Sequence, residues 1–293
     1  GEARYTLAGL YLLIALFPFA KDRDGDRQPL LQDHGHLWLA AAGTALVLLV
    51  PALVFGGPTI DDWWDLAFIR SYVDGSLGFG EAMFDGGLVH PRFMWNSWLV
   101  LQALVVEFSG YDAALLQTGL LTLAVCLLSV SALCYFAEAV FGLGPAATAS
   151  VLCLPLWVHG TEALPYFTRL HLDKFTAALV FMPVLLGATL NCLKRGRGWN
   201  LAVVAVAAVS LCAVHSLVYC VATLGVALCV VAFTVTGRSG LRAPASVLLA
   251  AAVPACYPIL QAIMMSPLFA AQGISFASPD NPVVRAHLWL GRL

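Results

Sequence analysis

Long apolar runs separated by short polar stretches dominate the chain. A helix needs about 20 apolar residues to cross a bilayer core of about 30 Å. Eight runs approach that length and predict eight transmembrane helices, at about 5–20, 37–57, 113–136, 146–160, 175–193, 201–218, 219–236 and 244–264. The unbroken run from Leu201 to Thr236 is too long for one span, so it predicts a helical hairpin with its tip near His215 and Ser216.

Basic residues mark three of the polar stretches between these runs. They are Lys21, Arg23 and Arg27 in the first, Lys194, Arg195 and Arg197 in the second, and Arg238 and Arg242 in the third. Lysine and arginine concentrate in cytoplasmic loops, so we expect all three stretches to face the cytoplasm. The loops at 58–112, 161–174 and 265–293 then face the exterior, and they hold most of the carboxylates.

One further apolar segment, from Phe93 to Phe108, would break this alternation if it crossed the membrane, because the stretch at Lys194 would then lie outside. The segment is short and contains Asn96, Gln102 and Glu107. A charge at mid-membrane costs about 2.5–3.5 kcal/mol. We therefore predict an amphipathic helix that lies in the outer interface or is re-entrant. Residues 58–112 then form one long external loop, and long loops are often functional.

Composition supports the membrane assignment. Hydrophobic residues make up 60% of the 293 residues and charged residues 11%, whereas soluble domains carry about 25% charged residues. These values exclude a soluble enzyme and a disordered chain, and the net charge of −2 excludes a nucleic-acid binder. The eight cysteines all lie in apolar runs, without a CxxC motif, as expected of buried free thiols. The sequence therefore predicts an all-α polytopic membrane protein.

The external loop opens with a helix signal. Thr59 followed by Asp62 fits a capping box and predicts a helix that begins at about residue 60. Arg70 and Asp74 are four residues apart and predict an ion pair on that helix. These features alone are typical of a helix lying at the membrane surface.

Capping leaves part of the acidic cluster unexplained. Asp61, Asp62 and Asp65 place three carboxylates within five residues, more than one helix start requires. Crowded carboxylates could coordinate a divalent cation through their oxygens. One of them could equally act as a general base toward a hydroxyl or amine.

Two basic clusters share the external side. His90 and Arg92 flank a proline just ahead of the in-plane segment, where Arg92 could bind a lipid phosphate or simply extend to the interface. Arg169, Asp173 and Lys174 lie in the next external loop. Arg169 and Asp173 are four residues apart, so a helix-end ion pair is one interpretation. The other is that this loop and the Asp61 loop close over one site.

The order of these motifs resembles the GT-C superfamily of polytopic glycosyltransferases, which includes the protein O-mannosyltransferases and aminoarabinose transferases. In that family an external loop opens with an acidic pair, and a His/Pro-rich turn, an in-plane helix ending in Phe-x-Gly and a later acidic loop follow. The corresponding residues here fall within 37–195: Asp61-Asp62, Asp74-Gly75, His90-Pro91, Trp95 to Phe108-Ser109-Gly110, Phe141-Gly142, Ala146-Ala147, Pro155 and Arg169 to Asp173.

The resemblance implies transfer of a sugar from a polyprenyl-phosphate donor to an acceptor glycan, lipid or protein on the external side. Asp61 would be the catalytic base or a ligand of a divalent metal, Mg or Mn, and Asp62 its partner. Asp173 would be the later acidic residue. We predict that the lipid phosphate binds Arg92, Arg169 and Lys174, because these residues are basic and are expected on the external side. His90 completes the predicted substrate-binding set.

We expect three parts: an additional N-terminal helix and cytoplasmic loop at 1–36, a GT-C-like transmembrane domain at 37–264 with the external loop 58–112, and an external segment at 265–293. Members of the family usually have more helices, so we expect a fragment. The resemblance implies an integral protein of the bacterial inner membrane, surrounded by the lipid bilayer, with its active site outside. The alternative is a non-catalytic membrane subunit or scaffold that docks a partner through 58–112.

Overall fold

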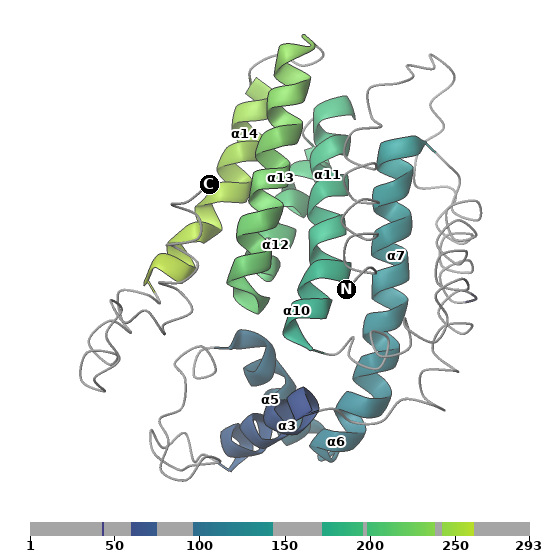
Figure 1. Ribbon diagram of the computed structural model, residues 1–293, viewed down its shortest axis with the longest axis vertical. Helices are drawn as coiled ribbons and strands as arrows, with labels where there is room; N and C mark the ends of the chain where they lie inside the picture. The colour runs from purple at the N-terminus through teal and green to yellow at the C-terminus, as the bar shows by residue number, and fades with distance from the viewer. Residues whose placement is uncertain are drawn as a thin grey trace.

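The computed structural model describes residues 43, 60–74, 96–142, 172–195, 198–237 and 242–260. Every regular element in this part of the chain is a helix. Figure 1 shows long helices packed side by side, with short helices at one end of the bundle. Three predicted spans, 5–20, 37–57 apart from Gly43, and 146–160, lie outside the described residues.

The described helices fall into three groups along the chain. The first is α3 (Ile60–Val73) and α5 (Ser97–Ser109). The second is one continuous helix formed by α6 (Ala113–Leu115), the π-helical η2 (Leu116–Leu121) and α7 (Thr122–Phe141). The third comprises α10 (Asp173–Thr176), the π-helical η3 (Ala177–Phe181), α11 (Met182–Arg195), α12 (Gly198–Val214), α13 (Ser216–Val235), α14 (Arg242–Ala252) and the 3-10 turn η4 (Val253–Ala255).

Four continuous helices in the described residues are long and apolar enough to cross a membrane. They are Ala113–Phe141, Asp173–Arg195, Ser216–Val235 and Arg242–Leu260. Helix α12 is apolar but shorter, at 17 residues. This part of the chain is therefore compatible with a helical membrane protein, as the apolar runs predict.

The predicted hairpin tip at His215 is confirmed. His215 has an extended backbone, with φ −155° and ψ 100°, and separates α12 from α13. Its Nδ1 accepts a hydrogen bond from the backbone N–H of Val218 at 3.3 Å and so caps α13. The imidazole supplies the acceptor that the first turn of a helix lacks.

Two predicted helix ends differ from the structure. The span predicted at 113–136 continues to Phe141 and ends at Gly142, whose φ of 67° suits glycine and whose N–H donates to the carbonyl of Glu138. The span predicted from residue 175 begins two residues earlier. Asp173 and Lys174 therefore lie in the first helical turn and not in a loop, because a polar residue at a helix start can satisfy backbone N–H groups.

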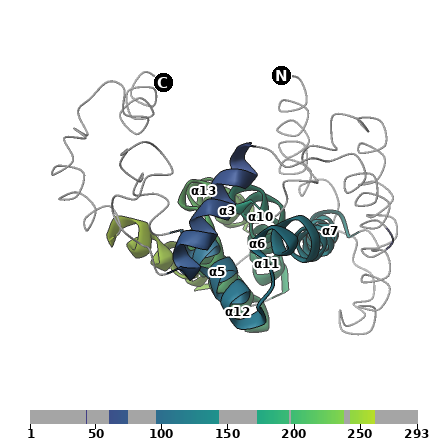
Figure 2. The ribbon, with the colours of Figure 1, turned by 90° about the horizontal axis from the view of Figure 1, so that it is seen from below.

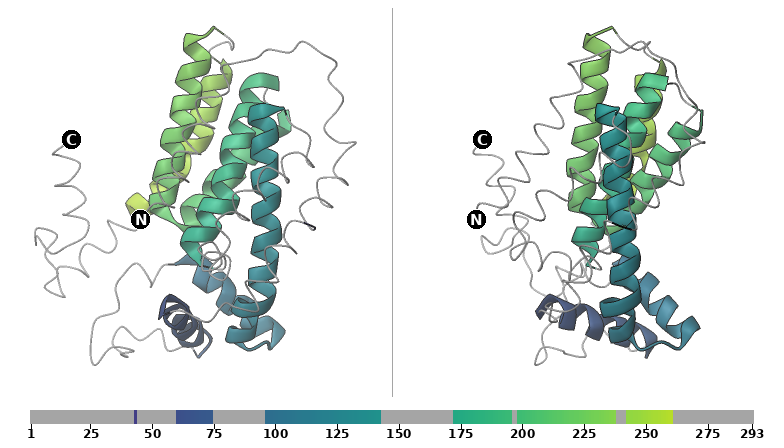
Figure 3. Two further views of the ribbon diagram at one scale, coloured as in Figure 1. Left: turned by 45° about the vertical axis from the view of Figure 1, so that its right-hand side comes forward. Right: turned by 90° about the vertical axis from the view of Figure 1, so that its right-hand side faces the viewer.

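Helices α3 and α5 lie across the end of the bundle, as Figures 2 and 3 show. Helix α5 is the segment predicted to lie in the membrane plane, and its orientation relative to the long helices agrees with that prediction. It has 13 residues, too few to span a bilayer. Gly110, with φ 69°, ends the helix in the left-handed conformation. We call this end of the bundle the α5 end.

The two ends of the bundle differ in charge. Most carboxylates of the described side chains lie at the α5 end: Asp65, Asp74, Glu107, Asp112 and Asp173. The long helix that starts at Asp173 runs away from α5 and ends at Arg195. Lys194, Arg195 and Arg242 therefore lie at the opposite end (Figure 1). Arg70 and Lys174 lie at the α5 end, so the carboxylates follow the predicted alternation of loops more closely than the basic residues do.

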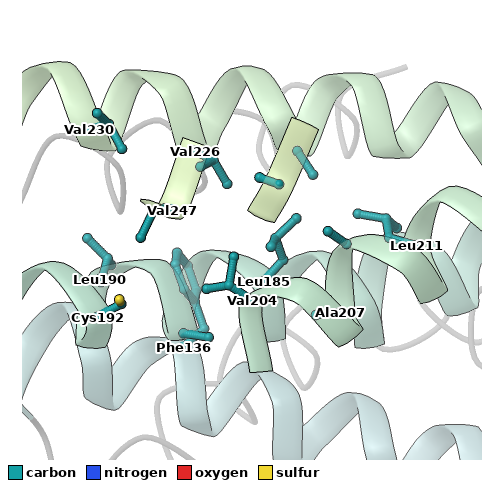
Figure 4. Close-up of a cluster of buried hydrophobic side chains, with 14 of the residues drawn as sticks. Phe136, Leu185, Leu190, Cys192, Val204, Ala207, Leu211, Val226, Val230 and Val247 are labelled. Carbon is teal, nitrogen blue, oxygen red and sulfur yellow. The ribbon is translucent and has the colours of Figure 1, made fainter. Parts of the chain in front are cut away.

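Helix α11 lies at the centre of the largest hydrophobic core cluster. Figure 4 shows Phe136 of α7, Leu185 of α11, Val204 of α12, Val226 of α13 and Val247 of α14, side chains that are buried together. The outer faces of the bundle are apolar as well, and on α13 the leucines at 217, 224 and 228 are exposed. An apolar exterior around an apolar core is typical of helices that face lipid.

Gly187 allows α11 to approach α7 closely. A Cβ at this position would lie 2.8 Å from Cε1 of Tyr135 and 3.3 Å from Cα of Phe136. The Tyr135 hydroxyl accepts a hydrogen bond from Asn191 Nδ2 at 3.1 Å, one helical turn beyond Gly187. A larger residue would displace both the ring and this hydrogen bond.

We expect Gly187→Ala to lower the free energy of unfolding by about 1–3 kcal/mol, the usual cost of overpacking. Thermal unfolding in detergent, followed with a thiol-reactive dye that labels the buried Cys126, Cys134, Cys192 and Cys212 as they become exposed, measures this change. Gly119→Ala is the matched control, because its Cβ would meet nothing within 4 Å. Equal melting temperatures for the two variants would contradict the packing argument.

Candidate functional site

Three side-chain hydrogen bonds join α5 to the ends of the long helices. Asn96 contacts Asp173 at 3.0 Å, Ser97 contacts Tyr257 at 3.0 Å, and Gln102 contacts Gln117 at 2.9 Å. The partners are 77, 160 and 15 residues away along the chain. Polar residues of α5 thus hold it against the bundle, and its first two contacts enclose the candidate site.

Both polar atoms of the Asn96 side-chain amide form hydrogen bonds. Its Oδ1 accepts hydrogen bonds from the backbone N–H groups of Trp98 at 3.0 Å and Leu99 at 3.3 Å, which caps α5. Its Nδ2 donates to Oδ2 of Asp173 at 3.0 Å. Asn96 is 7% exposed. The residue that caps α5 is therefore the residue that contacts the predicted acidic site residue.

Asp173 is a buried carboxylate at the start of a long helix. It is 8% exposed, and its Oδ1 accepts a hydrogen bond from the backbone N–H of Lys174 at 2.6 Å. Lys174 is partly buried, and its Nζ lies 5.7 Å from the centre of the Phe175 ring, within range of a cation–π contact. A charged pair of neighbours thus lies where α5 meets the bundle.

Hydroxyl groups lie near the start of α5, which Asn96 caps. The hydroxyls of Ser97 on α5 and Tyr257, near the end of the last described helix, are 3.0 Å apart. Tyr72 of α3 lies close enough to Tyr257 for electrostatic interaction, and burial, with a smaller contribution from Tyr257, raises the pKa of Tyr72 to about 12. Tyr72 therefore stays protonated at neutral pH and can donate a hydrogen bond.

The acidic cluster of α3 is described only in part. The helix begins at Ile60, which agrees with the predicted start at about 60. Asp61 and Asp62 lie in its first turn, but their side chains lie outside the described residues. Asp65 is 9% exposed and faces the protein.

The predicted ion pair between Arg70 and Asp74 is wrong. Arg70 Nη2 instead lies 3.5 Å from Oδ2 of Asp112, the residue that caps α6. Because α3 packs beside α6, the helix that Asp112 caps, Asp112 lies within reach of Arg70. Both side chains are more than half exposed, so we expect this pair to contribute at most about 1 kcal/mol.

The structure covers some of the predicted site residues and not others. His90, Arg92 and Arg169 lie outside the described residues, as does the proposed contact of Arg169 with Asp173. Asp173 and Lys174 are described and lie at the α5 end. Among the described residues, none of the His, Cys, Asp and Glu side chains form a group of three or more that could hold a metal ion. A metal at Asp61 stays a prediction.

Sequence reasoning missed Asn96, Ser97 and Tyr257. In the sequence, Asn96 and Gln102 are interpreted only as polar residues that make a membrane span unfavourable. An asparagine directly before an apolar run is also a helix-capping signal. Two partners of α5, Asp173 and Tyr257, are so distant in sequence that no local pattern links them. The site therefore becomes visible only in the folded chain.

Comparisons with protein-family models, with curated proteins and with solved structures find no match to this chain. The functional interpretation therefore depends on the order of the sequence motifs and on the contacts at the α5 end.

Gln102 and Gln117 form a buried amide pair whose remaining groups lack partners. Gln102 is 2% and Gln117 1% exposed, and within the described part of the chain Nε2 of Gln102 and Oε1 of Gln117 make no hydrogen bond. Each amide therefore depends on the other for the one hydrogen bond between them, which joins α5 to η2.

We expect Gln102→Leu alone to destabilise the protein by about 1–3 kcal/mol, because it leaves the Gln117 amide buried with no side-chain partner. The double variant Gln102→Leu/Gln117→Leu removes both amides, so its cost should be smaller than that of the single variant. Thermal unfolding of the single and double variants measures the difference. Additive losses would contradict the dependence of one amide on the other.

Proposed function

We propose that the protein is a membrane glycosyltransferase that moves a sugar from a polyprenyl-phosphate donor to an acceptor on the external side of a bacterial inner membrane. In this proposal the chain has eight spans, and the loop 58–112 with α3 and α5 is external. The acceptor class, a glycan, a lipid or a protein, stays open. The α5 end of the bundle is the active side.

One observation carries the proposal. The acidic residue that the GT-C resemblance places in the later loop, Asp173, is buried against Asn96, the residue that begins the in-plane helix. The motif order alone requires no such contact. A resemblance made of short, separated motifs gains support when two of them meet in the fold. The position of Lys194, Arg195 and Arg242 at the opposite end supports the proposed orientation, whereas Arg70 and Lys174 lie at the α5 end.

The exposed face of α5 suits a lipid-linked donor. Its exposed apolar residues fall on one helical face: Val100, Leu101, Leu104, Val105 and Phe108. Glu107 and Ser109 are also exposed, near the end of the helix. Phe108 is 86% exposed. A polyprenyl chain beside this face would place its phosphate near the polar residues at the start of α5. The same face also suits the alternative function, in which a non-catalytic subunit docks a protein partner.

The proposed reaction is a substitution at the anomeric carbon of the sugar. The acceptor oxygen forms a bond to that carbon, the bond between the carbon and the phosphate oxygen breaks, and polyprenyl phosphate leaves with the bonding electrons. Asp61 accepts the proton of the acceptor hydroxyl. Arg92, Arg169 and Lys174 stabilise the charge of the leaving phosphate. In the other role open to Asp61, its oxygens hold a divalent cation, Mg or Mn.

We expect Asp61→Asn to reduce consumption of a radiolabelled polyprenyl-phosphate sugar at least a hundredfold, because an amide cannot accept the proton. The assay uses membranes that contain the acceptor and a panel of hexose and pentose donors. The melting temperature should stay within about 2 °C of the wild-type value, since the change at a helix start is nearly isosteric. Asp74→Asn, which alters an exposed carboxylate of the same segment, should retain activity.

Two results would contradict the proposal. A wild-type protein that consumes no donor, together with co-purification of a stable protein partner, favours the scaffold. Loss of folding in the Asp61→Asn variant would indicate that Asp61 has a structural role and not a catalytic one.

Sidedness gives an independent prediction. In intact cells, a cysteine introduced at Gly87 should react with a membrane-impermeant maleimide, and one introduced at Gly196 should not react until the membrane is permeabilised. Both cysteines are introduced into a variant in which Cys220 and Cys256 have been replaced, because these two native cysteines are exposed. Reaction of both sites from the same side would contradict the external position of the loop 58–112.

A further inference from the structure

The three contacts that hold α5 differ in charge. Ser97 with Tyr257 and Gln102 with Gln117 are pairs of neutral groups. Only the third, Asn96 with Asp173, includes a carboxylate, and that residue is 8% exposed. Two of these three hydrogen bonds thus join α5 to the long helices without a carboxylate.

A buried carboxylate is costly in a protein. Burying a charge is far less favourable than burying a neutral amide, unless partners satisfy it. Ionisable residues in the membrane-spanning part of a protein accordingly mark functional sites more often than packing sites. Two neutral side chains matched to each other would join the helices without this cost, so the carboxylate at position 173 calls for a role beyond joining the two helices.

We infer that Asn96 is a positioning residue, which holds the Asp173 carboxylate in the orientation that substrate binding requires. The inference rests on the proposed function. Asn96 fixes Oδ2 through its Nδ2, and the backbone N–H of Lys174 fixes Oδ1. Two donors from different elements thus set the position and the plane of the carboxylate. Because Asn96 is itself fixed as the cap of α5, movement of α5 changes the orientation of Asp173.

The geometry permits an exchange of the two side chains. In the double variant Asn96→Asp/Asp173→Asn, the aspartate at 96 can accept from the N–H groups of Trp98 and Leu99, and the asparagine at 173 can donate to it. The asparagine oxygen can still accept from the N–H of Lys174. Each of these hydrogen bonds has a counterpart and the net charge is unchanged, but the carboxylate has moved from α10 to the start of α5.

The experiment measures melting temperature and donor consumption for wild type, Asp173→Asn and the exchange variant. We expect Asp173→Asn to lower both and the exchange to restore the melting temperature while donor consumption stays at least a hundredfold below wild type. A carboxylate that only joins two helices would work from either position. Recovery of donor consumption together with stability in the exchange variant would therefore overturn the inference.

A second comparison keeps the inference testable if the exchange variant does not fold. Asn96→Ser retains a capping oxygen but is too short to reach Asp173. Ser97→Ala removes the neighbouring contact of α5 with Tyr257 and leaves Asp173 untouched. At equal melting temperatures, Asn96→Ser should lower donor consumption by up to about a hundredfold, as misplacing a reacting group by about 1 Å does. Equal donor consumption in the two variants would overturn the inference.

The outcomes separate this inference from the proposed function. Loss of donor consumption in Asp61→Asn, combined with wild-type consumption in Asp173→Asn, overturns the inference and leaves the glycosyltransferase proposal in place. A wild-type protein that consumes no donor from the panel overturns the proposed function, and the inference with it.

Discussion

The hydrogen bond between Asn96 and Asp173 joins the start of α5 to the start of the long helix Asp173–Arg195. Polar groups removed from water must find partners, and at the end of an apolar bundle few partners exist. Helix α5 meets this constraint by burying Gln102 and its capping residue Asn96, which form hydrogen bonds with the bundle. The apolar residues Trp98, Leu99 and Ala103 are buried beside them. This arrangement fixes α5 across the bundle and brings its N-terminal cap against a buried carboxylate.

This arrangement explains why the two ends of the bundle differ. The α5 end gathers carboxylates, tyrosine and serine hydroxyls and an asparagine, while the opposite end carries Lys194, Arg195 and Arg242. A lipid-linked donor needs polar groups near a surface that accepts its hydrocarbon tail. The start of α5 lies beside such polar groups, and the rest of α5 exposes an apolar face. Chemistry at one end of a membrane bundle is thus compatible with a substrate that arrives within the bilayer.

Much of the fold could be predicted from the sequence, because long apolar runs and the distribution of basic residues are local signals. Segment length predicts the hairpin at His215, and it predicts that the segment near Asn96 is too short to cross the membrane. The candidate site could be predicted only in part. Arg70 was assigned the partner nearest in sequence, Asp74, whereas the fold supplies Asp112. Asp173 was expected in a loop beside Arg169, but it lies in a helix and contacts a residue 77 positions away.

The most direct test of this account is a cryo-electron microscopy structure of the protein in lipid nanodiscs with an added polyprenyl phosphate. The account predicts that α5 lies at the level of the headgroups with the Asn96 amide against Asp173, and that the phosphate lies beside the first turn of α10. A structure in which α5 crosses the bilayer, or in which the phosphate lies at the end that carries Arg195, would contradict it.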